Sequence, residues 1–317
     1  MPSSVFIDGE AGTTGLQIRE RLQRRGDLQL RSLPADQRKD PAARADALNS
    51  ADVAILCLPD EAARAAVAMI QSDATVVIDA STAHRTSAGW IYGFPELARG
   101  QRDLIRSARR IANPGCYATG FIALVRPLVD AGILPSDSPL SVNAISGYTG
   151  GGKAMITEFE AEPTEQGQAP VYRIYATGLQ HKHLPEMRAH AGLEHPPVFA
   201  PAVSRFPQGM IVEVPLQLWS MPGLPGLADL QRALEQAYAG ERFIEVVSRD
   251  EAKTMGELDP RLCNHTNQMK LMVFGDDAGR QARLVAVLDN LGKGAAGAAV
   301  QNLNIALGLP EHQGLEG

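Results

Sequence analysis

The chain has 317 residues, more than a single hydrophobic core usually accommodates, so two domains are expected. Its composition, 44% hydrophobic and 21% charged, is that of an ordinary globular protein. A formal net charge of −6 and the absence of a dense Lys/Arg patch in the sequence argue against a nucleic-acid binder.

The sequence also predicts neither a membrane span nor a signal peptide. Its longest apolar runs are interrupted well short of a bilayer crossing, and the N-terminal MPSSVFIDGE has no basic n-region. Three widely separated cysteines, Cys57, Cys116 and Cys263, predict no disulfide framework. This cysteine usage suits a reducing cytoplasm.

The first third of the chain alternates short apolar runs with helical patterns. Strands are expected at Ser4–Asp8, Leu28–Leu33, Asp52–Leu58 and Thr75–Ala80, and helices at Thr13–Arg25, Pro41–Ser50 and Glu61–Gln71. Wholly apolar strands alternating with helices predict an α/β fold with a doubly wound parallel sheet of the Rossmann type.

After Cys116 the pattern changes to many strands and few helices, which predicts an α+β substrate and dimerisation domain with a mixed or antiparallel sheet. The expected elements are a helix at Tyr117–Val129, strands at Ser141–Ser146, Val171–Thr177, Val198–Phe206, Met210–Trp219, Phe243–Ser248, Met269–Gly275 and Ala282–Asn290, and helices at Leu227–Ala239 and Gly294–Leu309. The segment 146–153, SGYTGGGK, is expected to be a loop. The predicted domains are residues 1–116 with 291–317, and residues 117–290.

Glycines recur in the turn between the first strand and the first helix, GEAGTTG at residues 9–15. Such glycines let the backbone approach a pyrophosphate and leave helix N–H groups to receive it. The spacing G-x-x-G-x-x-G is not the commoner G-x-G-x-x-G, and it also occurs in plain turns. Its position between a strand and a helix favours dinucleotide binding by Gly9, Gly12, Thr13, Thr14 and Gly15.

The second strand ends in Arg31 and Ser32, where an NAD-specific site usually has an acidic residue that grips the ribose 2′-hydroxyl. An arginine and a serine suit a 2′-phosphate instead, so the predicted cofactor is NADP. The other interpretation is that Arg31 is an ordinary solvated arginine.

Cys116 follows the Pro-Gly turn at residues 114–115 and opens an apolar helical segment. The unpaired N–H groups and the macrodipole of a helix N-terminus stabilise a thiolate, which lowers the pKa of a cysteine there. Buried structural cysteines are commoner, and Cys57 within VAILCLP fits that type. Cys116 occupies a turn instead, so we predict that it is a nucleophile.

A nucleophilic cysteine needs a proton carrier, and the segment QHKHLPEM supplies His181 and His183 with Glu186 three residues beyond. A zinc pair is the alternative for H-x-H, but no further cysteine or acidic cluster completes a site, so no metal is predicted. The other five histidines, among them His84, are expected at the surface or in caps.

Two further segments are typical of anion-binding loops. DASTAHR, residues 79–85, follows the carboxyl end of a strand, where ligands bind in open α/β sheets. SGYTGGGK is glycine-rich and ends in Lys153. Arg85 and Lys153 are therefore candidate ligands of a phosphate or carboxylate, and either loop could equally be a flexible turn.

Several of these motifs together resemble the N-acetyl-γ-glutamyl-phosphate reductase family, which is related to aspartate-semialdehyde dehydrogenase. The resemblance covers nearly the whole chain and rests on the glycine turn and on YGFPEL (92–97), NPGCYATG (113–120), SGYTGGGK, HKHLPEM (181–187) and NLGKGAAGAAVQNLN (290–304). The chain is similar to the family's shorter form, since it has TGGGK and PAVSRFPQGM where the longer form commonly has SGAGR and TPHL.

The resemblance implies an NADPH-dependent reduction of N-acetylglutamyl 5-phosphate to the 5-semialdehyde and phosphate in arginine biosynthesis. Cys116 would form a thioester, and His183 would be the acid/base, oriented by Glu186, with His181 as its rival. It also implies that Asn290 and Gly294 contact the cofactor, that Asn113 contacts the substrate, and that the C-terminal helix returns to the first domain.

Three alternatives stay open from the sequence. A sister reductase acting on an aspartyl or aminoadipyl phosphate would share the chemistry but not the side-chain pocket. A cysteine hydrolase would use Cys116 and His183 without nicotinamide, and a nucleotide-sensing regulator would keep only the fold. The small-molecule substrate is expected to be the main ligand, and the many strands after Cys116 favour a homo-oligomer, a dimer or a tetramer.

Overall fold

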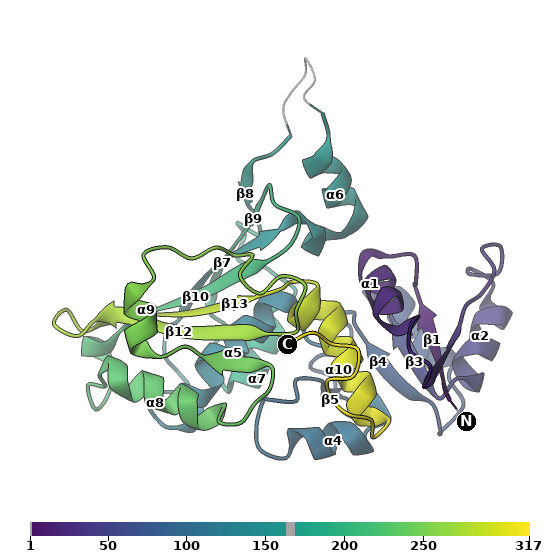
Figure 1. Cartoon of the computed structure of the whole chain (residues 1–317), viewed down its shortest axis with the longest axis horizontal. Helices are drawn as coiled ribbons and strands as arrows, with labels where there is room; N and C mark the ends of the chain where they lie inside the picture. The colour runs from purple at the N-terminus through teal and green to yellow at the C-terminus, as the bar shows by residue number, and fades with distance from the viewer. Residues whose placement is uncertain (1, 163–168) are drawn as a thin grey trace. The chain divides into compact units, whose positions relative to one another are not determined.

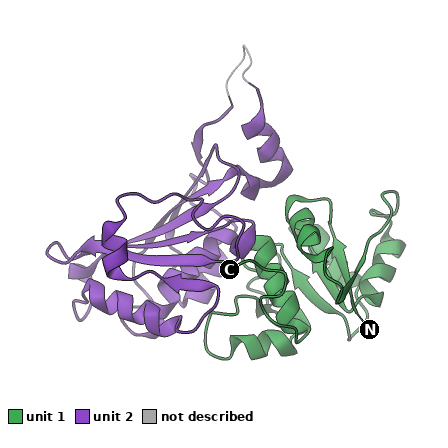
Figure 2. Cartoon of the chain, viewed as in Figure 1, with its two compact units in different colours: residues 1–115, 295–316 green, residues 116–294, 317 purple. Residues whose placement is uncertain are grey.

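The computed structural model describes residues 2–162 and 169–317. The chain divides into two compact units, residues 1–115 with 295–316 and residues 116–294 with 317 (Figure 2). The boundaries therefore fall after Gly115 and Gly294, where the sequence placed them after residues 116 and 290. We call these parts unit 1 and unit 2.

Unit 1 contains a six-stranded sheet in the order β2-β1-β3-β4-β6-β5, with every neighbouring pair parallel. Its strands are β1 Ser3–Asp8, β2 Leu28–Arg31, β3 Val53–Leu56, β4 Val76–Asp79, β5 Ile91–Tyr92 and β6 Arg110–Ala112. All four residues of β3 and of β4 are buried, as expected for parallel strands that are covered on both faces.

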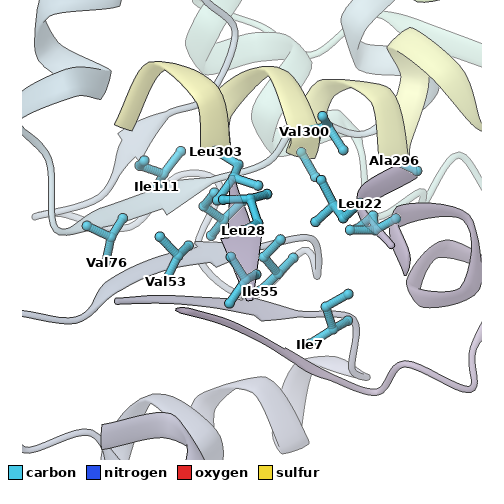
Figure 3. Close-up of a cluster of buried hydrophobic side chains, with 14 of the residues drawn as sticks. Ile7, Leu22, Leu28, Val53, Ile55, Val76, Ile111, Ala296, Val300 and Leu303 are labelled. Carbon is cyan, nitrogen blue, oxygen red and sulfur yellow. The ribbon is translucent and has the colours of Figure 1, made fainter. Parts of the chain in front are cut away.

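Two hydrophobic clusters cover the two faces of this sheet. The helices are α1 Thr13–Leu22, α2 Pro41–Ser50, α3 Asp60–Met69, α4 Gln101–Ser107 and α10 Gly297–Ala306. On one face α1 and α10 supply Leu22, Val300 and Leu303, which pack against strand residues such as Ile55 (Figure 3). On the other face α2 and α3 supply Leu48 and Ala66. The sheet is therefore doubly wound, and α10 belongs to unit 1.

Unit 2 contains a seven-stranded mixed sheet in the order β11-β12-β13-β10-β7-β9-β8. Figure 1 labels all of these strands except β11. The strands are β7 Ser141–Gly147, β8 Tyr172–Ile174, β9 Val198–Ser204, β10 Met210–Gln217, β11 Ile244–Val246, β12 Met269–Asp276 and β13 Gln281–Leu288. Pairs β7–β9 and β11–β12 are parallel, and the other pairs are antiparallel. The predicted mixed sheet is present.

The long helix α5, Cys116–Asp130, packs against β10 and β13 and places its first residue at a fixed point of unit 2. A Cβ on Gly120 would lie 2.9 Å from Val212 Cγ2, so a glycine allows the helix to approach the sheet closely. The other helices of unit 2 are α6 Gly152–Glu160, α7 Leu184–Ala191, α8 Leu227–Ala237 and α9 Arg249–Thr254. Of these, α7 and α8 contact α5.

Several elements differ from the sequence prediction. The expected loop at residues 146–153 is only partly a loop, because a 3₁₀ turn spans Tyr148–Gly151 and α6 begins at Gly152. The expected strand at residues 171–177 shortens to β8. The elements β5, β6, α4, α7 and α9 were not predicted, because segments of two to eight residues are too short to show a clear period.

Candidate active site

Cys116 is the first residue of α5. It is half-buried, and it is not part of a disulfide. The first turn of a helix leaves backbone N–H groups without intrahelical acceptors, and its macrodipole favours negative charge. This is the position that the sequence predicted for the cysteine. A thiolate or an oxyanion at the start of α5 would be stabilised by these groups.

The backbone of Gly294 passes directly beside Cys116. A Cβ on this glycine would lie 2.8 Å from Cys116 Cβ and 3.3 Å from its Cα. The first distance is too short for two carbon atoms, so one of the two segments would have to move. The Gly294 N–H donates to the Asp289 carbonyl at 2.9 Å, which holds the segment in place. A glycine is therefore needed here to make room for the cysteine. Its contact with the cofactor stays a prediction.

Asn113, predicted to bind substrate, is buried in unit 1 and is held on both sides of its amide. Its Nδ2 donates to the Ala295 carbonyl at 3.0 Å, and its Oδ1 accepts from Asn302 Nδ2 at 3.1 Å. The Arg85 Nε donates to the Asn113 carbonyl at 3.0 Å, and Arg85 Nη2 donates to the Ala80 carbonyl at 3.1 Å. Two predicted substrate residues, Arg85 and Asn113, are thus brought together.

The loop that carries Arg85 is ordered around the buried carboxylate of Asp79. This carboxylate accepts from the Ser81 N–H at 2.9 Å and from Ser81 Oγ at 2.7 Å, and lies 2.6 Å from His84 Nδ1. The His84 ring stacks on Trp90 with centroids 4.1 Å apart. The expectation that His84 lies at the surface or in a cap is wrong, because Asp79 and Trp90 draw it into the interior.

His183 lies at the N-terminus of α7 with Glu186 in the first turn, and both residues are buried. The His183 Nε2 is 3.9 Å from Glu186 Oε1, close enough for the carboxylate to stabilise an imidazolium. The backbone N–H of His183 donates to His181 Nδ1 at 3.1 Å. The neutral His181 ring therefore carries its proton on Nε2. The two rings lie nearly perpendicular, with centroids 4.7 Å apart.

Two tyrosines that the sequence analysis did not single out surround this pair. Tyr117 and Tyr175 have ring centroids 5.9 Å and 5.7 Å from that of His181. The pKa of Tyr175 is raised to about 12, mainly by burial; a hydrogen bond with Tyr117 opposes the rise, and the electrostatic effect of Cys116 adds to it. Burial likewise raises the pKa of Tyr117, whose hydroxyl donates to the Ala202 carbonyl at 3.0 Å. Both are neutral hydroxyl groups at physiological pH.

Sequence offered a signal for one of these tyrosines only. Tyr117 follows Cys116 directly within the NPGCYATG segment. Tyr175 lies far away in the chain, just after β8, and only packing brings it to His181. Together with the two histidines, these side chains form an aromatic cluster within unit 2.

The glycine-rich turn of unit 1 is packed so closely that side chains would not fit at two of its glycines. Gly9 has φ +88°, and a Cβ on it would lie 2.3 Å from the Cys57 carbonyl oxygen. A Cβ on Gly15 would lie 2.5 Å from the Gly9 carbonyl oxygen. Gly12 precedes α1 and provides no side-chain cap, and the first amides of a helix have no acceptor within the helix. These residues fit a dinucleotide.

The residues predicted to recognise the cofactor ribose have different surroundings. Arg31 Nη1 donates to Ser50 Oγ at 2.5 Å, at the last residue of α2. Ser50 shortly precedes β3, so the Arg31 guanidinium is directed toward the amino ends of the strands. Ser32 Oγ donates to Glu10 Oε2 at 2.9 Å, inside the glycine-rich turn.

Asn290 and Lys153 are the remaining predicted site residues. Asn290 is buried, and its amide joins two segments of unit 2: Oδ1 accepts from the Gly209 N–H at 2.7 Å, and Nδ2 donates to Thr149 Oγ1 at 3.0 Å. Lys153 is exposed in the first turn of α6. Their contacts with cofactor and substrate stay predictions.

Within residues 2–162 and 169–317, no group of three or more His, Cys, Asp or Glu side chains is arranged to hold a metal ion. In the same residues no helix is long and apolar enough to cross a membrane.

Both parts of the chain match models of one family. Residues 5–105 match the NAD binding domain of semialdehyde dehydrogenases, and residues 116–290 match their dimerisation domain. Aspartate semialdehyde dehydrogenase II from Vibrio cholerae aligns with a TM-score of 0.71 at 19% identity, covering 97% of this chain and 99% of that one. Aspartate semialdehyde dehydrogenase with NADP from Candida albicans aligns with a TM-score of 0.64 at 13% identity, covering 96% and 98%. The predicted fold class is confirmed: it is that of the semialdehyde dehydrogenases.

Sequence comparison narrows this class. The N-acetyl-gamma-glutamyl-phosphate reductase of Trichormus variabilis is 52% identical over 317 residues, covering 98% of each chain. The N-acetyl-gamma-glutamyl-phosphate reductase of Brucella anthropi is 52% identical over 309 residues, covering 97% of this chain and 99% of the relative. This chain therefore belongs to the N-acetyl-gamma-glutamyl-phosphate reductase family, and the resemblance noted from its motifs is confirmed.

Proposed function

We propose that this chain reduces N-acetylglutamyl 5-phosphate to N-acetylglutamate 5-semialdehyde and phosphate, with NADPH as the reductant and Cys116 as the nucleophile. The observation that carries the proposal is the position of Cys116 at the N-terminus of α5, in the same unit as the buried pair His183 and Glu186. The reaction matches the name of the relatives that are 52% identical to this chain.

In the first step His183 takes the proton of the Cys116 thiol, and Cys116 Sγ attacks the acyl carbon of the substrate. The new carbon–sulfur bond replaces the carbon–oxygen bond to phosphate, and His183 passes its proton to the departing phosphate. The amide groups at the start of α5 stabilise the negative oxygen that forms during attack. The product of this step is a thioester on Cys116.

Gly12 and the amides that open α1 would hold the pyrophosphate of the cofactor in unit 1. When bound, the dinucleotide supplies the hydride that reduces the thioester to the aldehyde level. Cys116 Sγ then leaves the reduced carbon as a thiolate, and a proton taken up from solvent restores the thiol for another substrate. NADP rather than NAD is part of the proposal.

The geometry favours His183 over His181 as the acid/base. Glu186 lies beside His183 and stabilises its protonated form, which exists between thiol deprotonation and phosphate release. His181 accepts a backbone N–H through Nδ1, and a hydrogen bond of this kind opposes protonation of that nitrogen. We therefore assign His181 a positioning role, fixing the backbone of His183.

Arg85, Asn113 and Lys153 complete the proposal as groups that bind the phosphate or carboxylate of the substrate. Arg85 is the strongest of the three, because two hydrogen bonds to backbone carbonyls orient its guanidinium. A homo-oligomer follows from the match of residues 116–290 to a dimerisation domain. The reactive thiol suits a reducing compartment such as the cytoplasm.

The reverse reaction tests this function, because the acyl phosphate is labile. NADP⁺ reduction is measured with N-acetylglutamate semialdehyde and phosphate, and separately with aspartate semialdehyde, for wild type and Cys116→Ser. Phosphate-dependent activity with the acetylated aldehyde alone, lost in the variant, is the expected result. Activity with aspartate semialdehyde instead would overturn the substrate assignment, and full activity of Cys116→Ser would overturn the mechanism.

A further inference from the structure

A compact ion cluster lies between the glycine-rich turn and the segment that follows β2. At its centre is Glu10, which is buried in the turn. Arg38 Nη2 lies 2.7 Å from Glu10 Oε1, and Arg19 Nη1 of α1 lies 3.3 Å from Oε2. Ser32 Oγ donates to the same Oε2 at 2.9 Å. We call these four residues the Glu10 cluster.

The Glu10 cluster carries an excess of positive charge toward solvent. Two guanidinium groups face a single carboxylate, so one positive charge is not balanced within the cluster. The side chains of Arg19 and Arg38 are 43% and 41% exposed, whereas that of Glu10 is 7% exposed. The carboxylate therefore lies beneath the arginines, and an anion that approaches from solvent meets the guanidinium groups first.

The position of the cluster matches one part of a dinucleotide. In parallel α/β sheets the ligand lies at the carboxyl ends of the strands, and the cofactor ribose lies at the end of the second strand. Glu10 directly follows β1 and its glycine, and Ser32 directly follows β2. The Glu10 cluster thus stands beside the pyrophosphate turn, where the 2′-substituent of a cofactor ribose is recognised.

Arg31, the arginine that the sequence favoured for this task, is directed elsewhere. Its guanidinium donates to Ser50 Oγ, near the amino end of β3. Hydrogen bonds from Ser4 lower the pKa of Asp52, and the charge of Arg31 lowers it by a smaller amount. Those groups lie at the opposite edge of the sheet from the glycine-rich turn. Arg31 is therefore in the wrong place to contact a ribose at the carboxyl edge.

We infer that Arg38 and Arg19 bind the 2′-phosphate of NADPH, and that Glu10 limits how strongly the chain prefers NADPH to NADH. This inference rests on the proposed function for the identity of the cofactor. The two guanidinium groups attract the phosphate, which NADH lacks. The Glu10 carboxylate holds both arginines in place, but its negative charge repels the phosphate. Preference for NADPH is thus set by opposing charges in one cluster.

Dissociation constants for NADPH and NADH, measured by titration of the full chain, test the inference without requiring catalysis. Arg38→Ala is expected to reduce the NADPH/NADH affinity ratio by roughly 10- to 100-fold, the effect of losing a hydrogen-bonded charge partner. Arg19→Ala, with the longer contact to Glu10, is expected to reduce it by about fivefold. Glu10→Gln keeps the shape of the side chain and is expected to raise the ratio about threefold or more.

Two further variants make the test specific. Arg24→Ala removes the same charge from an exposed residue just beyond α1, so it controls for long-range electrostatics. Arg31→Ala tests the rival assignment. A larger loss of NADPH preference in Arg31→Ala than in Arg38→Ala would overturn the inference. A lower NADPH preference in Glu10→Gln would overturn the limiting role of the carboxylate.

The outcome also separates this inference from the proposed function. A wild-type chain that binds NADH as well as NADPH would overturn the inference, while reductase activity with either cofactor would leave the Cys116 chemistry intact. A chain that prefers NADPH through Arg38 but does not turn over the acetylated aldehyde would support the inference and contradict the proposed function.

Discussion

The segments after β3 and after β6 each carry a cysteine, and their surroundings are opposite. Cys57 follows β3, and its N–H donates to the Asp8 carbonyl at 2.8 Å. Burial of its thiol, together with the charges of Asp79 and Asp8, raises the pKa of Cys57 to about 12. Cys116 follows β6 by a Pro-Gly turn and opens α5.

The comparison indicates that the backbone and charges around a cysteine, and not the residue type alone, decide whether a thiolate is favoured there. At Cys57 the chain continues from a buried strand, and the nearest charges are carboxylates, which oppose a thiolate. At Cys116 a helix begins, so amide groups and the helix dipole favour a thiolate. Cys263, buried in unit 2, resembles Cys57, because burial raises the pKa of its thiol to about 11.

The largest effect on kcat is expected when the cysteines are replaced by serine one at a time, and it is expected at Cys116. Cys116→Ser should lower kcat by about 10³-fold or more, because the serine hydroxyl is a far weaker nucleophile at neutral pH. Cys57→Ser is the matched control and should keep kcat within about twofold, with some loss of stability. Steady-state rates of the reverse reaction and thermal melting measure both. Equal losses of kcat in the two variants would contradict the claim that Cys116 and Cys57 differ in reactivity.

Removal of the proton carrier should have the next largest effect. His183→Ala is expected to lower kcat by about 10²- to 10⁴-fold, because the thiol and the leaving phosphate lose their proton relay. His181→Ala should cost about tenfold, since it only loosens the backbone of His183. The pH dependence of kcat distinguishes the roles: the limb due to the base should vanish in His183→Ala and persist in His181→Ala. The reverse pattern would assign the acid/base to His181.

Crowding beside the cysteine should have a smaller effect. Gly294→Ala places a Cβ 2.8 Å from Cys116 Cβ, so the helix start or the Gly294 segment must shift. A displacement of this kind is expected to lower kcat by roughly 10- to 100-fold without removing any reactive group. Gly256→Ala, in unit 2 just after α9, controls for a glycine substitution in general, because its Cβ position is open and its φ is not positive. Unchanged kcat in Gly294→Ala would show that the close approach does not position the thiol.

The smallest effect concerns the unreactive thiols and depends on pH. A thiol becomes nucleophilic as pH rises through its pKa, so at pH 9 a thiol with a pKa of about 12 is ionised to roughly one part in a thousand. Alkylation of the folded chain between pH 7 and 9, followed by peptide mass spectrometry, should therefore label Cys116 and leave Cys57 and Cys263 unlabelled. Rapid labelling of Cys57 in the folded chain would contradict the stated cause of its raised pKa.

The sequence predicted those features that depend on local residue order. The helix α2 has the predicted bounds because Asp40 caps it, accepting from the Ala43 N–H, and Pro41 fits its first turn. The start of α5 at Cys116 was predictable from the Pro-Gly turn before an apolar run. The strands of unit 1 were predictable from their uniformly apolar residues.

Features that depend on how side chains meet in the folded chain were not predictable. The burial of His84 depends on Asp79 and Trp90, which lie on either side of it in the chain and meet only in the folded loop. The approach of Tyr175 to His181 depends on the pairing of β8 with β9. The direction of the Arg31 side chain depends on its contact with Ser50 at the end of α2, which is 19 residues away in the chain.

A single-turnover measurement tests most directly whether Cys116 carries the acyl group. The chain is mixed with N-acetylglutamate semialdehyde and NADP⁺ in the absence of phosphate, and NADPH absorbance and peptide masses are followed. The predicted result is a burst of about one NADPH per active site, with an N-acetylglutamyl adduct on Cys116 that added phosphate removes. A burst of the same size in Cys116→Ser, or an adduct on another residue, would contradict the proposed mechanism.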